Sequence, residues 1–295
     1  MSQNILITGG SGFVGSYQVE KFSKNNYNVT IYDLLEPQYP LNDNINFIKG
    51  DIFDTKSLKS AVEQNDTVVH LVGLADASKA QSNPMLSYNI NILSLQNLLE
   101  ICRQAGNKKI IFPSSASIYG ISDDLPIKEN FPLKPTTIYP WHKLLCEKML
   151  QSYQVNYGVD YVILRLFNVY GKGNEGIIGL FLDKTKKREE IQSFGPFQYR
   201  DFVYAGDVAE AVYKAVAYDK AVNRIINIGS GKGIQIREIL KIICDIIPEA
   251  RWKEVKSQFP LYDSIADITL AKILLDFEPH TSMEFMKHVI ETEMI

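Results

Sequence analysis

The stretch T-G-G-S-G-F-V-G, Thr8–Gly15, decides how this chain begins to fold. It follows a short apolar run, Asn4–Thr8, and leads into a helical pattern over Phe13–Lys24. Its glycines fit both G-x-G-x-x-G, starting at Gly10, and G-x-x-G-x-x-G, starting at Gly9. Either spacing allows a tight turn, backbone that approaches a diphosphate, and a helix packed closely on a strand. The pattern therefore predicts a nucleotide-phosphate site on the N–H groups that open the helix.

An acid at the end of the next apolar run points to a dinucleotide. Asp33 closes the run Asn28–Asp33 and lies 18 residues beyond Gly15. A carboxylate there would accept both ribose hydroxyls and repel a 2′-phosphate, and no arginine stands beside it. The sequence therefore predicts NAD rather than NADP. Asp51, in K-G-D-I, is placed to meet the adenine, with a solvated turn aspartate as the alternative.

The first 170 residues alternate short apolar runs with longer helical patterns. The runs predicted to be strands are Asn4–Thr8, Asn28–Asp33, Asn46–Lys49, Thr67–Leu71, Lys109–Pro113 and Asp160–Phe167. The patterns predicted to be helices are Phe13–Lys24, Thr55–Gln64, Met85–Ala105 and Tyr139–Tyr157. Such alternation predicts an α/β fold, in which a doubly wound parallel sheet has helices on both faces.

The alternation of predicted strands and helices is less regular in the second part of the chain. The expected elements are loops at Gly171–Gly179 and Gly195–Arg200, helices at Asp207–Tyr218 and Arg237–Ile247, a strand at Arg224–Ile228 and a small helical cap at Ile265–Ile295. No repeat or Pro/Ser-rich linker interrupts the chain, which favours one compact unit with an appended lobe. We predict a nucleotide-binding domain over 1–170 and a smaller, mostly helical lobe over 171–295, with 201–228 returning to the first domain.

Composition excludes several classes of protein. Hydrophobic residues make up 45% and charged residues 22% of the 295 residues, which excludes a disordered chain and a coiled coil. The net charge of −3 gives no reason to expect nucleic acid. No apolar run is long enough to span a membrane, and the strand at Asn4 leaves no room for a signal peptide. Cys102, Cys146 and Cys244 form no cluster with the four histidines. We therefore expect no metal site, buried thiols and a cytoplasmic protein.

A tyrosine–lysine pair points to proton chemistry. Tyr139 and Lys143 form Y-x-x-x-K, one helical turn apart, so both side chains share a face. A neighbouring ammonium and an oxidised nicotinamide both favour the phenolate, which can exchange a proton with a substrate hydroxyl. Upstream, K-I-I-F-P-S-S-A-S-I-Y-G, Lys109–Gly120, ends a predicted strand in hydroxyls. Ser115 in this stretch can hydrogen-bond the same substrate oxygen.

Taken together, these motifs resemble the extended short-chain dehydrogenases/reductases, in their nucleotide-sugar epimerase/dehydratase branch. The chain also carries V-V-H-L, L-R-L-F-N-V-Y-G and R-D-F-V-Y-A-G-D-V in that family's order. The resemblance implies an NAD-binding Rossmann domain with a smaller sugar-nucleotide lobe. It implies that Ser115, four residues before Tyr119, acts with Tyr139 and Lys143 in catalysis, and that Lys143 also holds the nicotinamide ribose. The cofactor-binding residues that it implies are Gly9, Gly12, Phe13, Val14, Gly15, Asp33, Asp51, Ile52, Leu71, Tyr139 and Lys143.

The resemblance also assigns residues to the substrate. Asn168 matches an asparagine that contacts the substrate's phosphate or sugar, and Arg200 matches a position near the nucleotide. The expected substrate-binding residues are Ser115, Ser117, Asn168 and Arg200. Asp201 is expected to pin its loop, and His70 is expected to be a packed and satisfied histidine.

The residues that follow the active-site serine favour one reaction. Dehydratases and decarboxylases of this family carry acids at the two positions that are Ala116 and Ser117 here. Without them, the pattern favours hydride removal and return at a sugar carbon, which is 4-epimerisation. A nucleotide-sugar dehydrogenase or 4-ketoreductase is the alternative. A non-catalytic NAD-binding protein is less favoured, because the serine, tyrosine and lysine are intact.

Three features remain to be placed in the structure. Pro140-Trp141-His142 replaces a small residue and serine of relatives; Trp141 and His142 either alter the sugar pocket or merely pack, and packing is the favoured explanation. The family's R-x-G-D diphosphate grip is missing from Ser257–Ser264, where Lys172, Lys253 or Lys256 are possible substitutes. Relatives pair the helices that correspond to Met85–Ala105 and Tyr139–Tyr157 across a two-fold axis, so we expect an isologous homodimer.

Overall fold

Seven parallel strands form the central sheet, in the order β10-β6-β5-β4-β1-β2-β3. The computed structural model describes residues 3–122, 124–173, 176–257 and 261–295. The strands are β1 (Asn4–Thr8), β2 (Asn28–Asp33), β3 (Ile45–Lys49), β4 (Thr67–His70), β5 (Lys109–Ser115), β6 (Tyr161–Leu166) and β10 (Arg224–Ile228). Every residue of β4 and β6 is buried, which explains why these strands are mostly apolar in the sequence, and their buried polar side chains, such as Arg165, have partners. The predicted doubly wound sheet is confirmed.

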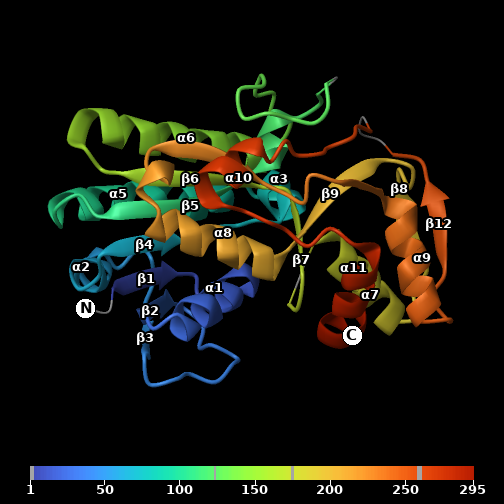
Figure 1. The fold of residues 1–295 in the computed structure, drawn as a ribbon, viewed down its shortest axis with the longest axis horizontal. Coiled ribbons are helices and arrows are strands. Elements are labelled where there is room, and N and C mark those ends of the chain that lie inside the picture. Colours follow the sequence, from blue (N-terminus) through green and yellow to red (C-terminus); the bar gives the residue numbers. More distant parts are fainter. Residues whose placement is uncertain (1–2, 123, 174–175, 258–260) are drawn as a thin grey trace.

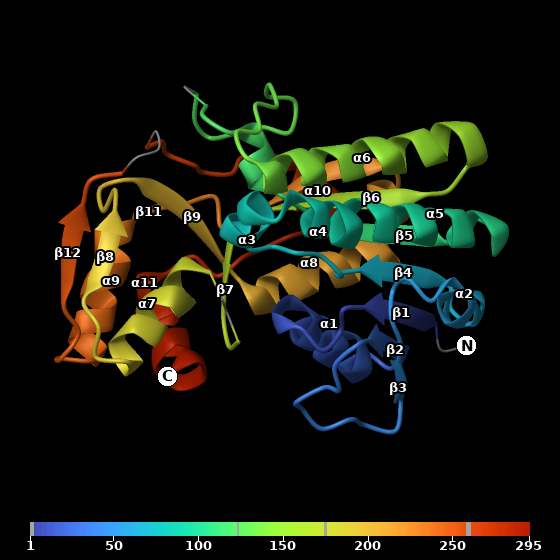
Figure 2. The same ribbon diagram turned by 180° about the vertical axis from the view of Figure 1, so that it is seen from behind.

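Helices cover both faces of this sheet (Figures 1 and 2). The helices on one face are α1 (Phe13–Lys24), α8 (Ala205–Ala217) and α10 (Thr269–Leu275). The helices on the other face are α2 (Thr55–Glu63), α5 (Ser94–Gln104) and α6 (Ile138–Tyr157). Each face has its own apolar core, so the sheet is the middle layer of a three-layer domain.

The helical pattern at Met85–Ala105 is not one continuous α-helix. After α3 (Ala77–Ser82), α4 (Pro84–Tyr88) leads into a π-helical turn at Asn89–Leu93, and α5 continues from it. Within this turn the side-chain oxygen of Asn91 accepts the N–H of Leu74 at 2.9 Å. A single wider turn barely disturbs three- and four-residue apolar spacing, so the sequence pattern did not reveal it.

A smaller lobe lies beyond the carboxyl end of the central sheet (Figure 1). Its three-stranded sheet contains β7 (Asn168–Tyr170), β9 (Tyr199–Tyr204) and β11 (Gly233–Gln235), and a separate pair contains β8 (Ile191–Phe194) and β12 (Trp252–Val255). Its helices are α7 (Ile177–Lys186), α9 (Ile236–Ile246), α11 (Met283–Val289) and a π-helical turn at Ile290–Met294. Short 3-10 turns lie at Ala116–Tyr119 and Asp219–Ala221. A third apolar core holds this lobe together.

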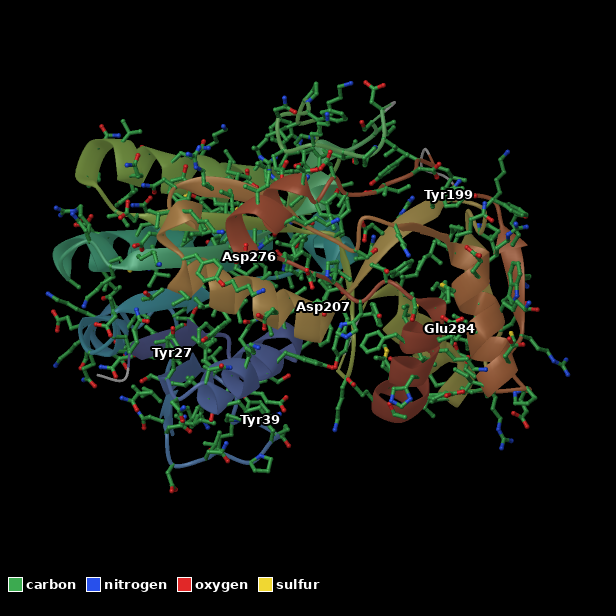
Figure 3. All side chains as sticks on the ribbon, viewed as in Figure 1. Tyr27, Tyr39, Tyr199, Asp207, Asp276 and Glu284 are labelled. Atoms are coloured by element: carbon green, nitrogen blue, oxygen red, sulfur yellow. The ribbon has the colours of Figure 1, made fainter. Side chains whose placement is uncertain are left out.

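Two expectations for this part of the chain were wrong. The strands of the small lobe were not predicted, and β9 begins at Tyr199, inside the expected loop Gly195–Arg200. The tail does not form one helical cap, because α10 packs on the central sheet whereas α11 packs in the small lobe. Between them, His280 donates its N–H to Asp207 at 2.8 Å and ties the tail to the first turn of α8, where Figure 3 labels Asp207. These strands have three to six residues, too few to set up a clear period.

Other expectations concern membranes, metals and thiols. Within the described ranges no helix is both long and apolar enough to cross a membrane. Those ranges also hold no group of three or more His, Cys, Asp or Glu side chains placed to bind a metal ion. Cys102 and Cys146 are buried as expected, whereas Cys244 is only half-buried.

Candidate active site

The glycine-rich loop between β1 and α1 is shaped by two positions where only glycine fits. Gly9 has a φ of +79°, which L side chains rarely adopt. A Cβ on Gly15 would overlap the carbonyl oxygen of Gly9, so α1 can approach the loop only without a side chain there. Gly12 precedes α1 in an extended conformation. The predicted close packing of helix, loop and strand is present.

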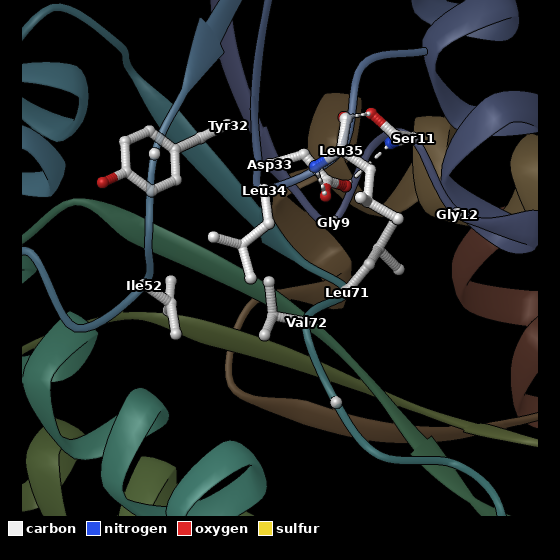
Figure 4. A pocket seen from close by; sticks show the side chains of 12 residues that line it. Gly9, Ser11, Gly12, Tyr32, Asp33, Leu34, Leu35, Ile52, Leu71 and Val72 are labelled. Carbon is white, nitrogen blue, oxygen red and sulfur yellow. Dashed lines mark hydrogen bonds between the residues drawn. The ribbon is translucent and has the colours of Figure 1, made fainter. Parts of the chain in front are cut away.

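Asp33 lies against this loop at the carboxyl end of β2. One carboxylate oxygen accepts the N–H of Ser11 at 3.0 Å, and the other accepts the N–H of Leu35 at 3.1 Å. A cavity of about 260 Å³ opens beside it (Figure 4). Its lining residues are Gly9, Ser11, Gly12, Tyr32, Asp33, Leu34, Leu35, Gly50, Ile52, Leu71, Val72 and Gly73. The structure thus brings together five of the predicted cofactor-binding residues from four segments of the chain.

Three other predicted cofactor-binding residues, Phe13, Val14 and Asp51, follow lining residues of this cavity directly in the sequence. Phe13 and Val14 form the first turn of α1, directly after the glycine loop. Asp51 is exposed, and its carboxylate accepts the N–H of Phe53 at 2.9 Å. The carbonyl of Asp51 accepts the hydroxyl of Tyr32 at 2.9 Å. In the described structure the Asp51 carboxylate therefore shapes a turn.

The predicted catalytic residues meet where β5 ends against the start of α6. The side chains of Ser115 and Tyr139 are hydrogen-bonded to one another. Ser115 Oγ also lies 2.8 Å from Ser117 Oγ. One turn further along α6, Lys143 Nζ donates to the carbonyl of Pro113 at 2.9 Å and lies 4.5 Å from the ring centre of Phe112. The side chains of Tyr139 and Lys143 therefore both face the last residues of β5.

Burial opposes the charged forms of this tyrosine and lysine. Desolvation raises the pKa of Tyr139 to about 12, although its hydrogen bond with Ser115 acts in the opposite direction. Desolvation lowers the pKa of the Lys143 amine, while Cys146 and Glu147 raise it. Further positive charge near Tyr139 is needed before its phenolate becomes a useful base at neutral pH.

A second cavity, of about 110 Å³, contains the predicted substrate-binding residues. Its lining residues are Ser115, Ala116, Ser117, Leu166, Phe167, Asn168, Arg200, Tyr262 and Ser264. Arg200 donates to the carbonyl oxygens of Tyr199 and Tyr262, and its guanidinium lies 4.9 Å from the ring centre of Tyr262. Asn168 donates to the carbonyl of Asp201 at 2.9 Å. The cavity thus joins the ends of β5 and β6 to β7, β9 and the segment before α10.

Tyr262 and Ser264 were not foreseen as parts of this cavity. They reach it because the N–H of Asp201 donates to the Ser264 carbonyl at 2.8 Å, and the N–H of Ser264 donates to the Tyr199 carbonyl at 3.0 Å. These backbone bonds seat the chain from Leu261 onward alongside β9. A pairing across about sixty residues leaves no local sequence signal.

The lysines considered as a diphosphate grip lie elsewhere. Lys253 is on β12 and forms an ion pair with Glu190 at 2.6 Å. Lys256 is exposed beyond the end of β12, and Lys172 is exposed just after β7. Residues 258–260, which belong to the stretch expected to hold the grip, lie outside the described residues. Arg200 is the positively charged residue that lines the second cavity.

Asp201 and His70 have structural roles. The buried Asp201 carboxylate accepts four hydrogen bonds, from the N–H and hydroxyl of Ser230, the N–H of Gly231 and the N–H of Ala266. It pins three segments, as expected. His70 is buried, and its Nδ1 lies 2.8 Å from the Thr8 hydroxyl. Burial lowers its pKa to about 3, so the ring is neutral. Its Nε2 has no partner within the described structure, so the expectation of a fully satisfied histidine was wrong.

The unusual Pro140-Trp141-His142 lies near the start of α6. Pro140 lies in the first turn, where its missing N–H costs no helical hydrogen bond. His142 is buried and its Nδ1 lies 2.8 Å from the Ser87 hydroxyl, so it packs as expected. Trp141 does not pack within the chain, because 49% of its surface is exposed.

Comparisons with known proteins agree with this geometry. Residues 5–229 match the model of the NAD dependent epimerase/dehydratase family. A Methanocaldococcus jannaschii protein, provisionally named a UDP-glucose 4-epimerase, is 38% identical over 250 residues, 81% of each chain. The Thermotoga maritima UDP-glucose 4-epimerase, solved with UDP-glucose, is 29% identical with a TM-score of 0.88, covering 99% of this chain and 97% of that one. The Brucella ovis UDP-glucose 4-epimerase, solved with NAD, is 27% identical with a TM-score of 0.90, covering 99% and 98%.

Proposed function

The chain belongs to the NAD-dependent epimerase/dehydratase family and is an NAD-dependent nucleotide-sugar 4-epimerase, and we propose that Ser115, Tyr139 and Lys143 perform its proton chemistry. One observation carries this assignment. Tyr139 is hydrogen-bonded to Ser115 beside a cavity that Ser115 shares with Asn168 and Arg200. A sugar in that cavity has a base, a hydroxyl partner and a cation within one site.

The loop and cavity at the end of β1 suit NAD. Gly9 and Gly15 leave room for the backbone turn that cradles a diphosphate, and the Asp33 carboxylate borders the same cavity. When bound, NAD supplies the acceptor and donor of the hydride exchanged with the sugar carbon. We propose that Gly9, Gly12, Phe13, Val14, Gly15, Asp33, Asp51, Ile52, Leu71, Tyr139 and Lys143 hold it.

In the proposed mechanism each catalytic side chain has a separate task. Tyr139 removes the proton from the sugar hydroxyl and returns it after the carbon has inverted, while Ser115 holds the same oxygen. The ammonium of Lys143 and the positive nicotinamide offset the burial that raises the pKa of Tyr139 to about 12. Ala116 and Ser117 offer no acid for elimination, so the hydride returns to the same carbon and the proton returns to the oxygen bonded to it.

We propose a uridine diphospho-hexose as the substrate, with Ser115, Ser117, Asn168 and Arg200 as its binding residues. Similar proteins are named for UDP-glucose, and one of them was solved with it. Arg200 supplies the positive charge that a diphosphate requires at the edge of the cavity. The remaining hydroxyl and amide side chains suit the sugar.

Incubation of the purified protein with UDP-galactose is expected to yield UDP-glucose without added reductant, as followed by NMR. Because hydride leaves and returns within one active site, product formed in deuterated water should carry no deuterium at C4, and added NAD should not be consumed. A set of GDP-, dTDP- and CDP-sugars serves as the control for the nucleotide. Stoichiometric accumulation of NADH would contradict epimerisation and favour the dehydrogenase alternative.

We also propose an isologous homodimer built on the helical stretch Met85–Ala105, which contains most of α4, the π-helical turn and α5, and on α6, which packs beside it (Figure 2). Large apolar side chains of this face are exposed in the single chain, including 67% of Met85, 49% of Trp141 and 45% of Leu145. A second copy would cover them.

Light scattering is expected to give twice the mass of one chain at micromolar concentration. Leu145→Asp should shift the mass to that of a single chain, because it places charge at the centre of the apolar face. Ile273→Asp is the matched control, since Ile273 is also exposed, at 59% against 45% for Leu145, but lies on α10, on the other face of the central sheet. A monomeric unmodified protein would contradict the proposal.

Two further assignments accompany these. We propose that 1–170 form the cofactor domain and 171–295 the sugar-nucleotide lobe, with 201–228 belonging to the cofactor domain; the pairing of β10 with β6 supports the return. We also propose a cytoplasmic location, supported by the three free thiols.

A further inference from the structure

Glu147 lies on the same side of α6 as the proposed catalytic residues, and no task has yet been given to it. Tyr139, Lys143 and Glu147 follow one another at four-residue steps, so they form a row along one face of the helix. Glu147 is 1% exposed. A carboxylate is rarely buried so completely unless specific partners hold it.

The partners of Glu147 belong to the strand that carries Ser115 and to its neighbour. The hydroxyl of Ser114 donates to Glu147 Oε1 at 2.6 Å. Arg165 of β6 grips both carboxylate oxygens, with Nε 3.1 Å from Oε1 and Nη2 2.8 Å from Oε2. Arg165 is itself buried, so the pair is closed off from water.

These contacts connect α6 to consecutive residues of β5. Lys143 bonds the carbonyl of Pro113, Glu147 bonds the hydroxyl of Ser114, and Tyr139 bonds the side chain of Ser115. The distance between the proposed base and its hydroxyl partner is therefore controlled by how α6 sits on the end of β5. Glu147 supplies the most deeply buried of these three links.

The hydrogen bonds of Arg165 continue across the sheet and restrict how its side chain can move. Arg165 lies opposite Ser114 on one side and Asn227 of β10 on the other in the strand register. Its Nη1 donates to the hydroxyl of Tyr119 at 2.8 Å and to the Glu129 carbonyl at 2.9 Å. The Tyr119 hydroxyl in turn donates to Asn227 at 2.7 Å. Arg165 is thus held by residues on both sides of it while it binds the Glu147 carboxylate.

We propose that Glu147 is a positioning residue of the active site, which locks α6 onto the end of β5 and presents a negative charge to Lys143. This inference rests on the proposed roles of Ser115, Tyr139 and Lys143. Stability alone is a weak reason for such a pair, because well-packed apolar residues often replace buried ion pairs without loss. Glu147 lies one helical turn from Lys143, and a role in positioning the active site explains this placement, whereas a role in stability does not.

The charge of Glu147 acts on Lys143. The titratable groups that face the Lys143 amine are Tyr139, Cys146 and Glu147 on α6 and His70 on β4. His70 is neutral, and burial raises the pKa values of the Cys146 thiol and the Tyr139 phenol to about 12, so the negative charge that faces Lys143 comes from the Glu147 carboxylate in its ion pair with Arg165. Glu147 raises the pKa of Lys143 against the desolvation that lowers it.

The test uses Glu147→Gln combined with Arg165→Met, which removes the ion pair without leaving one buried charge unpaired. We expect kcat to fall about 10- to 100-fold with a much smaller change in KM, because small misplacements of catalytic groups carry costs of that order. Activity is lost at high pH when Lys143 deprotonates. Without Glu147 that pKa is lower, so the alkaline limb of the pH profile should move to lower pH.

Two further variants separate positioning from stability. Glu147→Asp keeps the charge and should restore the alkaline limb while kcat stays reduced. Tyr119→Phe removes one acceptor of Arg165 without changing any charge. It should lower the thermal unfolding temperature and leave the alkaline limb in place. A double variant with wild-type kcat and an unmoved alkaline limb would overturn the proposal.

A substrate-free measurement keeps this test separate from the proposed function. Competitive labelling of lysine amines over a pH range, read by peptide mass spectrometry, gives the apparent pKa of Lys143 in the protein as purified. We expect a lower value in the double variant and the wild-type value in Tyr119→Phe. An unchanged Lys143 pKa in the double variant would overturn the inference about Glu147. Absence of epimerase activity in the unmodified protein would instead overturn the proposed function.

Discussion

Tyr139→Phe is expected to lower kcat by about 10²–10⁴-fold while leaving NAD affinity nearly unchanged. The substitution removes one oxygen, which is the atom proposed to exchange a proton with the sugar hydroxyl, and keeps the ring that packs at the start of α6. In the unmodified protein the Tyr139 side chain bonds Ser115. The variant removes that bond and leaves the serine hydroxyl available to the substrate. Steady-state kinetics and a fluorescence titration with NADH measure the two quantities.

The neighbouring residues supply controls for this result. Ser115→Ala should cost less than Tyr139→Phe, and the double variant should be non-additive, because both residues act on one proton transfer. Lys143→Ala should also weaken the cofactor complex, since Lys143 is proposed to hold the nicotinamide ribose. Full activity of Tyr139→Phe would show that the active site has been wrongly assigned.

Asp201→Asn is expected to lower the free energy of unfolding by about 3 kcal/mol, since an unsatisfied buried donor costs about 1–3 kcal/mol. Asp201 is fully buried, and each of its oxygens accepts two hydrogen bonds. An asparagine amide has only one accepting oxygen, so at least two donors would face an NH₂ group instead. Three of the donors lie just after β10 and the fourth precedes α10, whereas Asp201 itself lies on β9 of the small lobe, so the loss affects both lobes.

Chemical denaturation of the two proteins measures this difference. Asp43→Asn is the matched control, because Asp43 is exposed between β2 and β3 and the same charge is removed there. The control should change the free energy of unfolding by less than about 0.5 kcal/mol. A loss below about 1 kcal/mol for Asp201→Asn would mean that the pinned segments find other partners.

The central sheet was predictable because its strands are buried on both faces. Every residue of a strand such as β4 or β6 is buried, so each side chain must be apolar or must have a polar partner. This produces short, mostly apolar runs that can be recognised from the local sequence. The glycine spacing was equally informative, since Gly9 and Gly15 occupy positions where any side chain would be strained or would overlap backbone. Such constraints act between residues close in sequence.

The small lobe was less predictable for the opposite reason. Its strands are short, and β8 alternates buried and exposed residues over only four positions. The π-helical turn at Asn89–Leu93 escaped notice because it preserves the apolar spacing of the helix around it. In both cases the determining contacts come from distant segments.

The sequence by itself determined which residue types reach the carboxyl end of β5: a serine at the strand end and a tyrosine and lysine one helical turn apart. Only the tertiary structure decided how these groups behave. Tyr262 joins the second cavity through backbone pairing with β9, and Arg165 meets Glu147 because β6 lies beside β5 under α6. The pKa of Tyr139 likewise depends on burial by segments far along the chain. Spacing is a local property that the sequence displays directly, whereas burial and charge pairing are sums over neighbours that only the folded chain brings together.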